Sequence, residues 1–143
     1  TAEEASRMEI PYKEDEYPEY FMYGVLCAYG LYARHAKGIC LGDVKFRLAS
    51  EDMRAAIVCD KVEDMEICGF GGQGGEGADC LVKLRDCREA FLHGCRPLND
   101  IKTFLSLEGE KTGGINLRAN NLNRAKESVK MSGEVDGSEV LEK

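Results

Sequence analysis

The chain has 143 residues, of which 43% are apolar, and this length fits a single domain with a substantial core. Its net charge of −7 argues against sequence-independent binding to nucleic acid, because such binding requires Lys and Arg to neutralise phosphates. The chain has seven cysteines but no Cys-x-x-Cys pair, and its only histidines are His35 and His93. This composition argues against a structural zinc site or a thioredoxin-like centre, so we expect no metal and no cofactor.

The acidic side chains are concentrated at the two ends of the chain. Residues 1–19 contain seven acidic and two basic side chains together with Pro11 and Pro18, which favours an acidic N-terminal arm. Residues 126–143 are rich in Lys and Glu and are expected to form a polar, disordered tail. The intervening residues, 20–125, are predicted to form one disulfide-rich domain.

The first elements of this domain are predicted to be strands. The uncharged segment 20–33 is rich in aromatic residues and favours a long buried strand or a pair of strands, with a buried helix as the alternative. Its fourteen residues are too few to span a bilayer as a helix, which needs about twenty. A further strand is predicted at 44–48, where apolar and basic residues alternate.

Two helices are predicted in the middle of the chain. Ser50 can cap the first, whose packed face would contain Ala55, Val58, Cys59 and Val62. A strand at 65–70 and a flexible glycine-rich loop at 69–77 follow. The second helix would begin after Asp79 and end near Gly94, with one narrow stripe formed by Cys80, Leu84, Cys87, Phe91 and Cys95.

The remaining strands complete an α+β prediction. Residues 101–107 alternate in polarity and could form a hairpin with 115–118. No internal repeat is evident in this interpretation. We therefore expect a disulfide-stabilised sandwich in which two helices pack on an antiparallel sheet.

Cysteine usage favours a secreted protein with disulfides. Three disulfides and one unpaired thiol are expected, although spacing alone does not give the pairing, and an intracellular protein with seven reduced thiols is the alternative. Cys59 and Cys87 are favoured as members of bridges, because both would lie on buried helical faces, and Cys27 is a candidate partner for one of them. The candidate disulfide cysteines are Cys27, Cys40, Cys59, Cys68, Cys80, Cys87 and Cys95.

Candidate functional residues are few. His35 could act as a general base oriented by Asp43, as in a small phospholipase-like hydrolase, but a plain surface histidine is favoured. Tyrosine is common at interfaces because it combines a large contact area with a hydrogen-bonding tip. Tyr12, Tyr17 and Tyr20 are therefore the candidates for binding a partner.

The order of cysteines from Cys27 to Cys95 resembles that of the virus-encoded killer toxins of smut fungi and of small secreted fungal effectors. The resemblance includes the segments 44–48, 54–59, 66–68 and 87–95 and covers about half of the chain. It implies strands and two helices bridged by disulfides, and it transfers no catalytic residue.

Two functional hypotheses follow. The first is a secreted, extracellular toxin or effector that acts without catalysis by binding a protein or a cell-surface target. The second is a small secreted hydrolase that uses His35 and Asp43. A monomer that does not span a membrane is expected, and a dimer through the odd cysteine is the alternative.

Overall fold

The structure is a computed structural model, and it describes residues 1–9 and 26–143. Parallel strands form nearly all of it. In this part of the chain, thirteen strands accompany one short α-helix, Ala2–Ser6 (α1), and one 3₁₀ helix, Gly137–Glu139 (η2). Every pair of neighbouring strands is parallel. The α+β sandwich predicted from the sequence is therefore wrong.

The strands belong to three sheets that the chain visits in turn. Sheet A has the order β1-β4-β7-β10-β12, with bounds Ala28–Arg34, Ala55–Asp60, Val82–Arg85, Ile101–Glu108 and Ala125–Met131. Sheet B has the order β2-β5-β8-β11-β13, with bounds Lys37–Gly42, Glu63–Cys68, Arg88–His93, Gly113–Arg118 and Val140–Glu142. Sheet C is smaller and contains β3, β6 and β9, with bounds Lys45–Phe46, Gly71–Gly72 and Arg96–Pro97.

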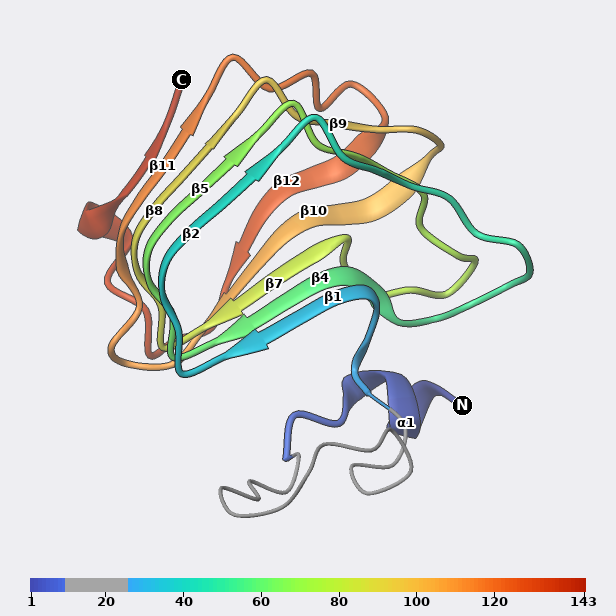
Figure 1. The fold of residues 1–143 in the computed structure, drawn as a ribbon, viewed down its shortest axis with the longest axis horizontal. Coiled ribbons are helices and arrows are strands. Elements are labelled where there is room, and N and C mark those ends of the chain that lie inside the picture. Colours follow the sequence, from blue (N-terminus) through green and yellow to red (C-terminus); the bar gives the residue numbers. More distant parts are fainter. Residues whose placement is uncertain (10–25) are drawn as a thin grey trace.

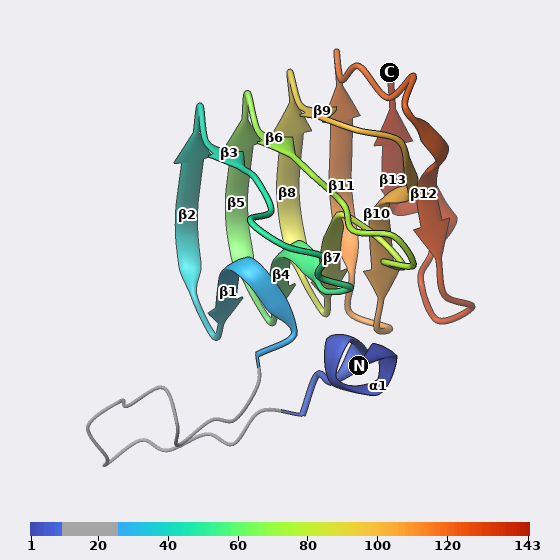
Figure 2. The ribbon, with the colours of Figure 1, turned by 90° about the vertical axis from the view of Figure 1, so that its right-hand side faces the viewer.

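Each passage through the sheets forms one coil, and the coils stack along a common axis (Figures 1 and 2). The first three coils add a strand to each sheet, whereas the last two add strands to sheets A and B only. This arrangement is a parallel β-solenoid. Because neighbouring coils lie about 4.8 Å apart, a side chain at one position stacks on its equivalent in the next coil.

The core consists of ladders of aliphatic side chains between the sheets. In sheet B, one ladder runs through Leu41, Ile67, Leu92 and Leu117, which occupy the same register position in successive coils. In sheet A, a matching ladder runs through Leu31, Ile57, Val82, Leu105 and Val129. The middle members of both ladders are almost fully buried, so the hydrophobic effect drives the coils together.

Left-handed backbone conformations mark the bends of the first four coils. At the corner between sheets B and C, Asp43, Gly69, Gly94 and Ala119 all have φ between 54° and 66° and recur every 25 or 26 residues. The backbone N–H of each donates a hydrogen bond to a carbonyl of the next coil or of the C-terminal residue, at 2.9 to 3.2 Å. His35, Lys61, Asp86 and Gly109 form the equivalent set between sheets A and B. The chain therefore contains an internal repeat that the sequence analysis missed.

Residues 1–9 cover part of the outer face of sheet A. The Met8 side chain is 8% exposed and packs in a cluster with Cys27, Ala55, Val58 and Cys80. As a result, β4 is buried at all six of its positions, with one face toward the core and the other toward residues 1–9. A strand buried on both faces has no polar alternation, and this explains why helical spacing was inferred for 50–62.

The other predicted elements are also replaced by solenoid strands. The second predicted helix is β7 and β8, which belong to different sheets and are separated by a bend at Asp86. The predicted hairpin strands are β10 and β11, which likewise lie in different sheets. Residues 126–143, interpreted as a tail, contribute β12 and β13.

Burial in the ladders predicts that two Leu→Ala variants lower the free energy of unfolding by very different amounts. Leu92→Ala removes a fully buried side chain and should lower the free energy of unfolding by about 2–5 kcal/mol. Leu141→Ala, at a residue 54% exposed on β13, should lower it by less than about 1 kcal/mol. Urea denaturation followed by circular dichroism measures both values, and equal losses would contradict the ladder.

The left-handed conformations at the corner between sheets B and C predict opposite changes in stability for two further variants. Ala119→Gly should stabilise the protein by about 0.5–1 kcal/mol, because a left-handed conformation is strained for alanine but not for glycine. Gly94→Ala should destabilise it by a similar amount, since an added Cβ meets nothing closer than 3.8 Å and only the backbone strain remains. The same denaturation experiment shows whether each variant raises or lowers the free energy of unfolding.

Candidate functional site

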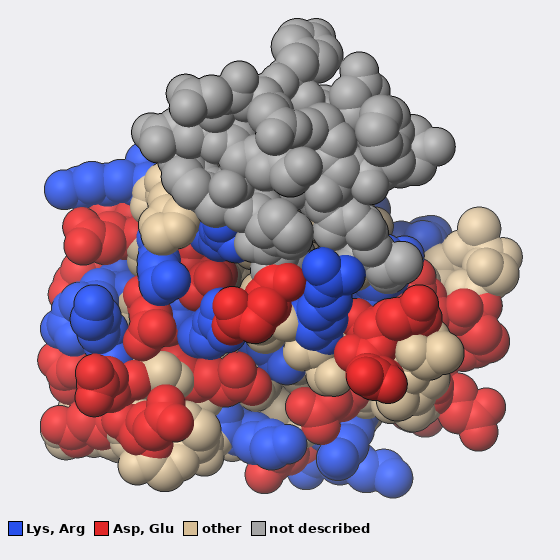
Figure 3. Space-filling view, turned by 90° about the horizontal axis from the view of Figure 1, so that it is seen from below, with Lys and Arg blue, Asp and Glu red and all other residues tan. Residues whose placement is uncertain are grey.

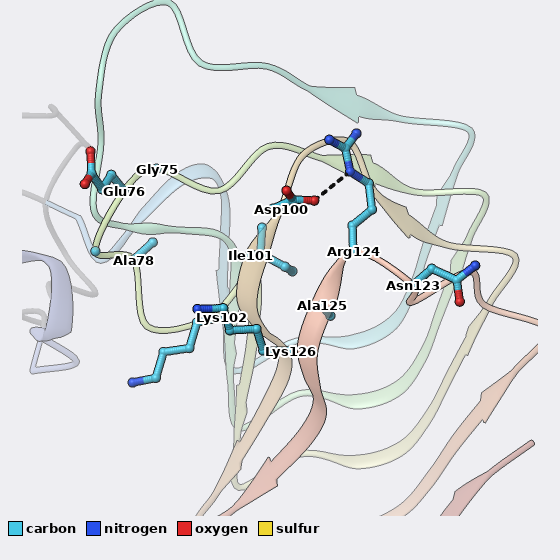
Figure 4. A pocket seen from close by; sticks show the side chains of 11 residues that line it. Gly75, Glu76, Ala78, Asp100, Ile101, Lys102, Asn123, Arg124, Ala125 and Lys126 are labelled. Carbon is cyan, nitrogen blue, oxygen red and sulfur yellow. Dashed lines mark hydrogen bonds and ion pairs between the residues drawn. The ribbon is translucent and has the colours of Figure 1, made fainter.

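A groove lies at the corner where the chain returns to sheet A. Its volume is about 680 Å³, and it crosses three successive coils. Ala78, Ile101 and Ala125 form its floor (Figure 4). Ile101 stacks on Ala125 in the strand register, so the groove runs along the solenoid axis. We call these residues and the charged rims described next the corner groove.

One rim of the corner groove is an ion pair that joins two coils. The Arg124 guanidinium donates from Nε to the Asp100 carboxylate at 3.0 Å and from Nη1 to the Leu98 carbonyl at 2.8 Å. Figure 4 shows this pair at one side of the hollow, with the two lysines on the other side. Arg124 therefore bonds to both the side chain and the backbone of the preceding coil.

The opposite rim contains Lys102 and Lys126, which follow the floor residues of their strands. The Lys102 ammonium lies 3.4 Å from the Asp79 carboxylate, which also pairs with Lys130 at 3.3 Å. Burial by itself would raise the pKa of Asp79, but the charges and hydrogen bonds of Lys130 and Lys102 outweigh it and lower the pKa. Among the described residues, Lys126 has no ion pair or hydrogen bond, so its ammonium is available to a ligand.

A hydrogen-bonded loop closes one end of the corner groove. The Asn99 side chain accepts from the Gly74 N–H at 2.9 Å and donates to the Gly74 carbonyl at 2.8 Å. Glu76 is fixed nearby, since its backbone N–H donates to the Glu51 carboxylate at 2.9 Å. The glycine-rich segment 69–77, expected to be a flexible loop, therefore contributes a strand (β6) and part of a groove wall.

The sequence analysis missed the residues of this groove. The available signal was the repeat, because Asp100 and Arg124, like Lys102 and Lys126, are 24 residues apart and occupy equivalent places in adjacent coils. Without the coil length, such separations carry no meaning.

The proposed dyad of His35 and Asp43 does not form. His35 precedes β2 and Asp43 follows it, so the two residues lie at opposite ends of a six-residue strand. At about 3.3 Å per residue, the strand that separates them is itself roughly 20 Å long. A carboxylate at that distance cannot orient the imidazole.

The tyrosines proposed for binding a partner, Tyr12, Tyr17 and Tyr20, lie outside the described residues. Of the remaining tyrosines, Tyr29 is part of the fold. Its hydroxyl donates to the Gln73 carbonyl at 2.5 Å, and its ring packs edge-on against Phe46. Partial burial raises the pKa of Tyr29 to about 12.

All seven cysteines are free thiols in this structure, so none of the candidate bridges is present. Five of them are buried, Cys68 is half-buried, and Cys40 is exposed. Cys87 and Cys95 lie at corners, where their thiols donate to carbonyls of the preceding coil at 3.4 and 3.6 Å. The thiols thus fill small apolar positions in the stack and satisfy corner carbonyls.

Burial also makes these thiols poor nucleophiles. Desolvation raises the pKa of Cys59 and of Cys80 to about 12 and that of Cys87 to about 11. The thiolate is the reactive form of cysteine, and a raised pKa keeps these groups protonated near neutral pH. No catalytic role is therefore assigned to them.

No protein-family model matches the chain, and comparisons with curated proteins and with solved structures also find no match. Nothing in these comparisons supports the killer-toxin resemblance, and the helix-on-sheet fold that it implies is not the fold of this chain. In the described part of the chain, no helix has the length and apolar character needed to cross a bilayer.

The burial of the cysteines predicts a stepwise reaction with a thiol reagent. In the native protein, Cys40 should react with Ellman's reagent first and Cys68 more slowly, while the other five should react only after unfolding. Cys40→Ser should remove the fast phase. Fewer than seven thiols in denaturant without a reductant would contradict the structure and restore the disulfide prediction.

Proposed function

We propose that this protein acts by binding, without catalysis, and that its ligand is a neutral linear glycan held in the corner groove. The observation that carries the proposal is the set of charged donors and acceptors that lines an apolar floor across successive coils. Glycan hydroxyl groups both donate and accept hydrogen bonds, so they match a groove that presents ammonium and carboxylate groups together.

The charge balance of the corner groove disfavours other polymers. Its lining contains three basic side chains, those of Lys102, Arg124 and Lys126, and two acidic ones, those of Glu76 and Asp100. Carboxylates in the groove would repel a polyanion, and the lysines would repel a polycation. Acidic and basic side chains are also interspersed on the face shown in Figure 3, where no extensive area of one sign is visible.

The length of the groove favours an extended ligand. Three coils span about 10 Å along the solenoid axis, since adjacent strands lie about 4.8 Å apart. In an extended β-linked sugar chain, the advance per sugar is similar to the spacing between adjacent coils. Neighbouring sugars can therefore contact equivalent positions in neighbouring coils. Repeat proteins commonly bind extended partners in this way along their stacked surfaces.

This proposal retains the expectation of a binding protein with a cell-surface target and replaces the candidate residues. The toxin or effector role and the extracellular location remain predictions from the sequence.

The proposal is tested by isothermal titration calorimetry with xylohexaose and cellohexaose. Lys126→Ala should weaken binding about ten- to 150-fold, which corresponds to one lost hydrogen bond to a charged group. Lys45→Ala, which removes an exposed lysine from β3, is the matched control and should leave affinity unchanged.

A second variant tests the position of the ligand. Ala125→Phe fills the floor of the groove and should abolish binding, while its melting temperature shows whether the fold is retained. Full affinity in a folded Ala125→Phe protein, or binding of neither hexasaccharide to the unmodified chain, would contradict the proposal.

A further inference from the structure

The solenoid has an open end at β2. This strand is the outermost one of sheet B, and β5 is its neighbour within the sheet. No described element lies beyond it (Figure 2). The backbone N–H of Asp43 points toward β5 and donates to the Cys68 carbonyl at 2.9 Å. Because backbone groups alternate in direction along a strand, the backbone groups of Gly42 and Cys40 point away from β5. An edge of this kind offers backbone hydrogen bonds to another strand.

Core side chains are incompletely covered at this end. Ile39 and Leu41 continue the inward-facing ladders of sheet B but are only half-buried. Their equivalents in the next coil, Met65 and Ile67, are 2% and 1% exposed. A strand added beside β2 would therefore bury aliphatic surface as well as satisfy backbone groups.

The edge of β2 has few of the features that usually prevent association. Natural edge strands are protected by charges, prolines or bulges, whereas β2 has the sequence Lys-Gly-Ile-Cys-Leu-Gly with one charge at its start. At the other end of sheet B, the outermost strand β13 has only three residues, against six in β2. Of the two outer edges of this sheet, β2 therefore offers the longer row of backbone groups.

We propose that two copies of this chain associate through β2, paired antiparallel about a two-fold axis at Cys40. In this register, Cys40 faces Cys40 of the second copy, and Ile39 faces Leu41 of the second copy on the core side. The charges at the strand ends are complementary, because Lys37 comes opposite Asp43 of the second copy at both ends. The present contact of Lys37 with Glu63 is 3.8 Å long and exposed, so it does not compete strongly.

The dimer is independent of the glycan proposal, since β2 contributes no residue to the corner groove. It also accounts for Cys40, the one exposed cysteine in the chain, without requiring a disulfide. Directly opposed side chains in an antiparallel pair have Cβ atoms about 5 Å apart, which places the two thiols within reach of a short crosslinker.

The test is sedimentation velocity of the full chain under reducing conditions, where a dimer is expected. Leu41→Lys places an ammonium in the new interface and should weaken the dimer at least about tenfold. Leu141→Lys, the same change on the exposed end of β13, is the matched control and should remain dimeric. Circular dichroism confirms that both variants are folded.

Crosslinking identifies the register. Bis-maleimidoethane should join two copies of the chain through Cys40, each thiol adding to one maleimide ring. Cys40→Ser should abolish the crosslink while the protein still sediments as a dimer. A monomer at every concentration, or a dimer that survives in folded Leu41→Lys and is not crosslinked through Cys40, would overturn the proposal.

Discussion

The register between successive coils is the constraint on which this structure depends. Parallel pairing fixes each residue above the one about 25 positions earlier, so an aliphatic side chain at one inward position requires an aliphatic side chain at the same position in the next coil. The ladder through Ile67, Leu92 and Leu117 shows the result, since all three are at most 2% exposed. A shift of one residue would turn these side chains toward solvent.

The same register determines which side chains become neighbours on the surface. Residues that are far apart in the chain become neighbours when their separation equals the length of a coil, as Asp100 and Arg124 do at the corner groove. Among the described residues, the outermost strand β2 has a neighbouring coil on one side only, and its inward-facing side chains are therefore less buried than their equivalents in β5. A groove across coils and an edge at the open end are thus two consequences of one architecture.

The cysteines show how the same residue type can indicate two architectures. Spacings of seven and eight residues among Cys80, Cys87 and Cys95 fit one face of a helix, and seven cysteines in a small protein favour disulfides. In the structure, these thiols occupy small buried positions in different parts of a coil, where desolvation raises their pKa values. Cysteine is among the most buried residue types even without a disulfide, because it behaves as a small apolar side chain.

The sequence by itself determined the apolar strands at 44–48, 65–70, 101–107 and 115–118, each of which overlaps a strand of the solenoid. Local alternation of polarity is sufficient for this, since it reports which face of a strand is buried. Only the tertiary structure decided the rest. The complete burial of β4 depends on packing with Met8 near the N-terminus, and the bends at Lys61 and Asp86 depend on left-handed conformations in residues other than glycine. Those conformations are held by hydrogen bonds between coils, so no local pattern reveals them. The corner groove is non-local for the same reason, because its charged side chains meet only when the coils stack.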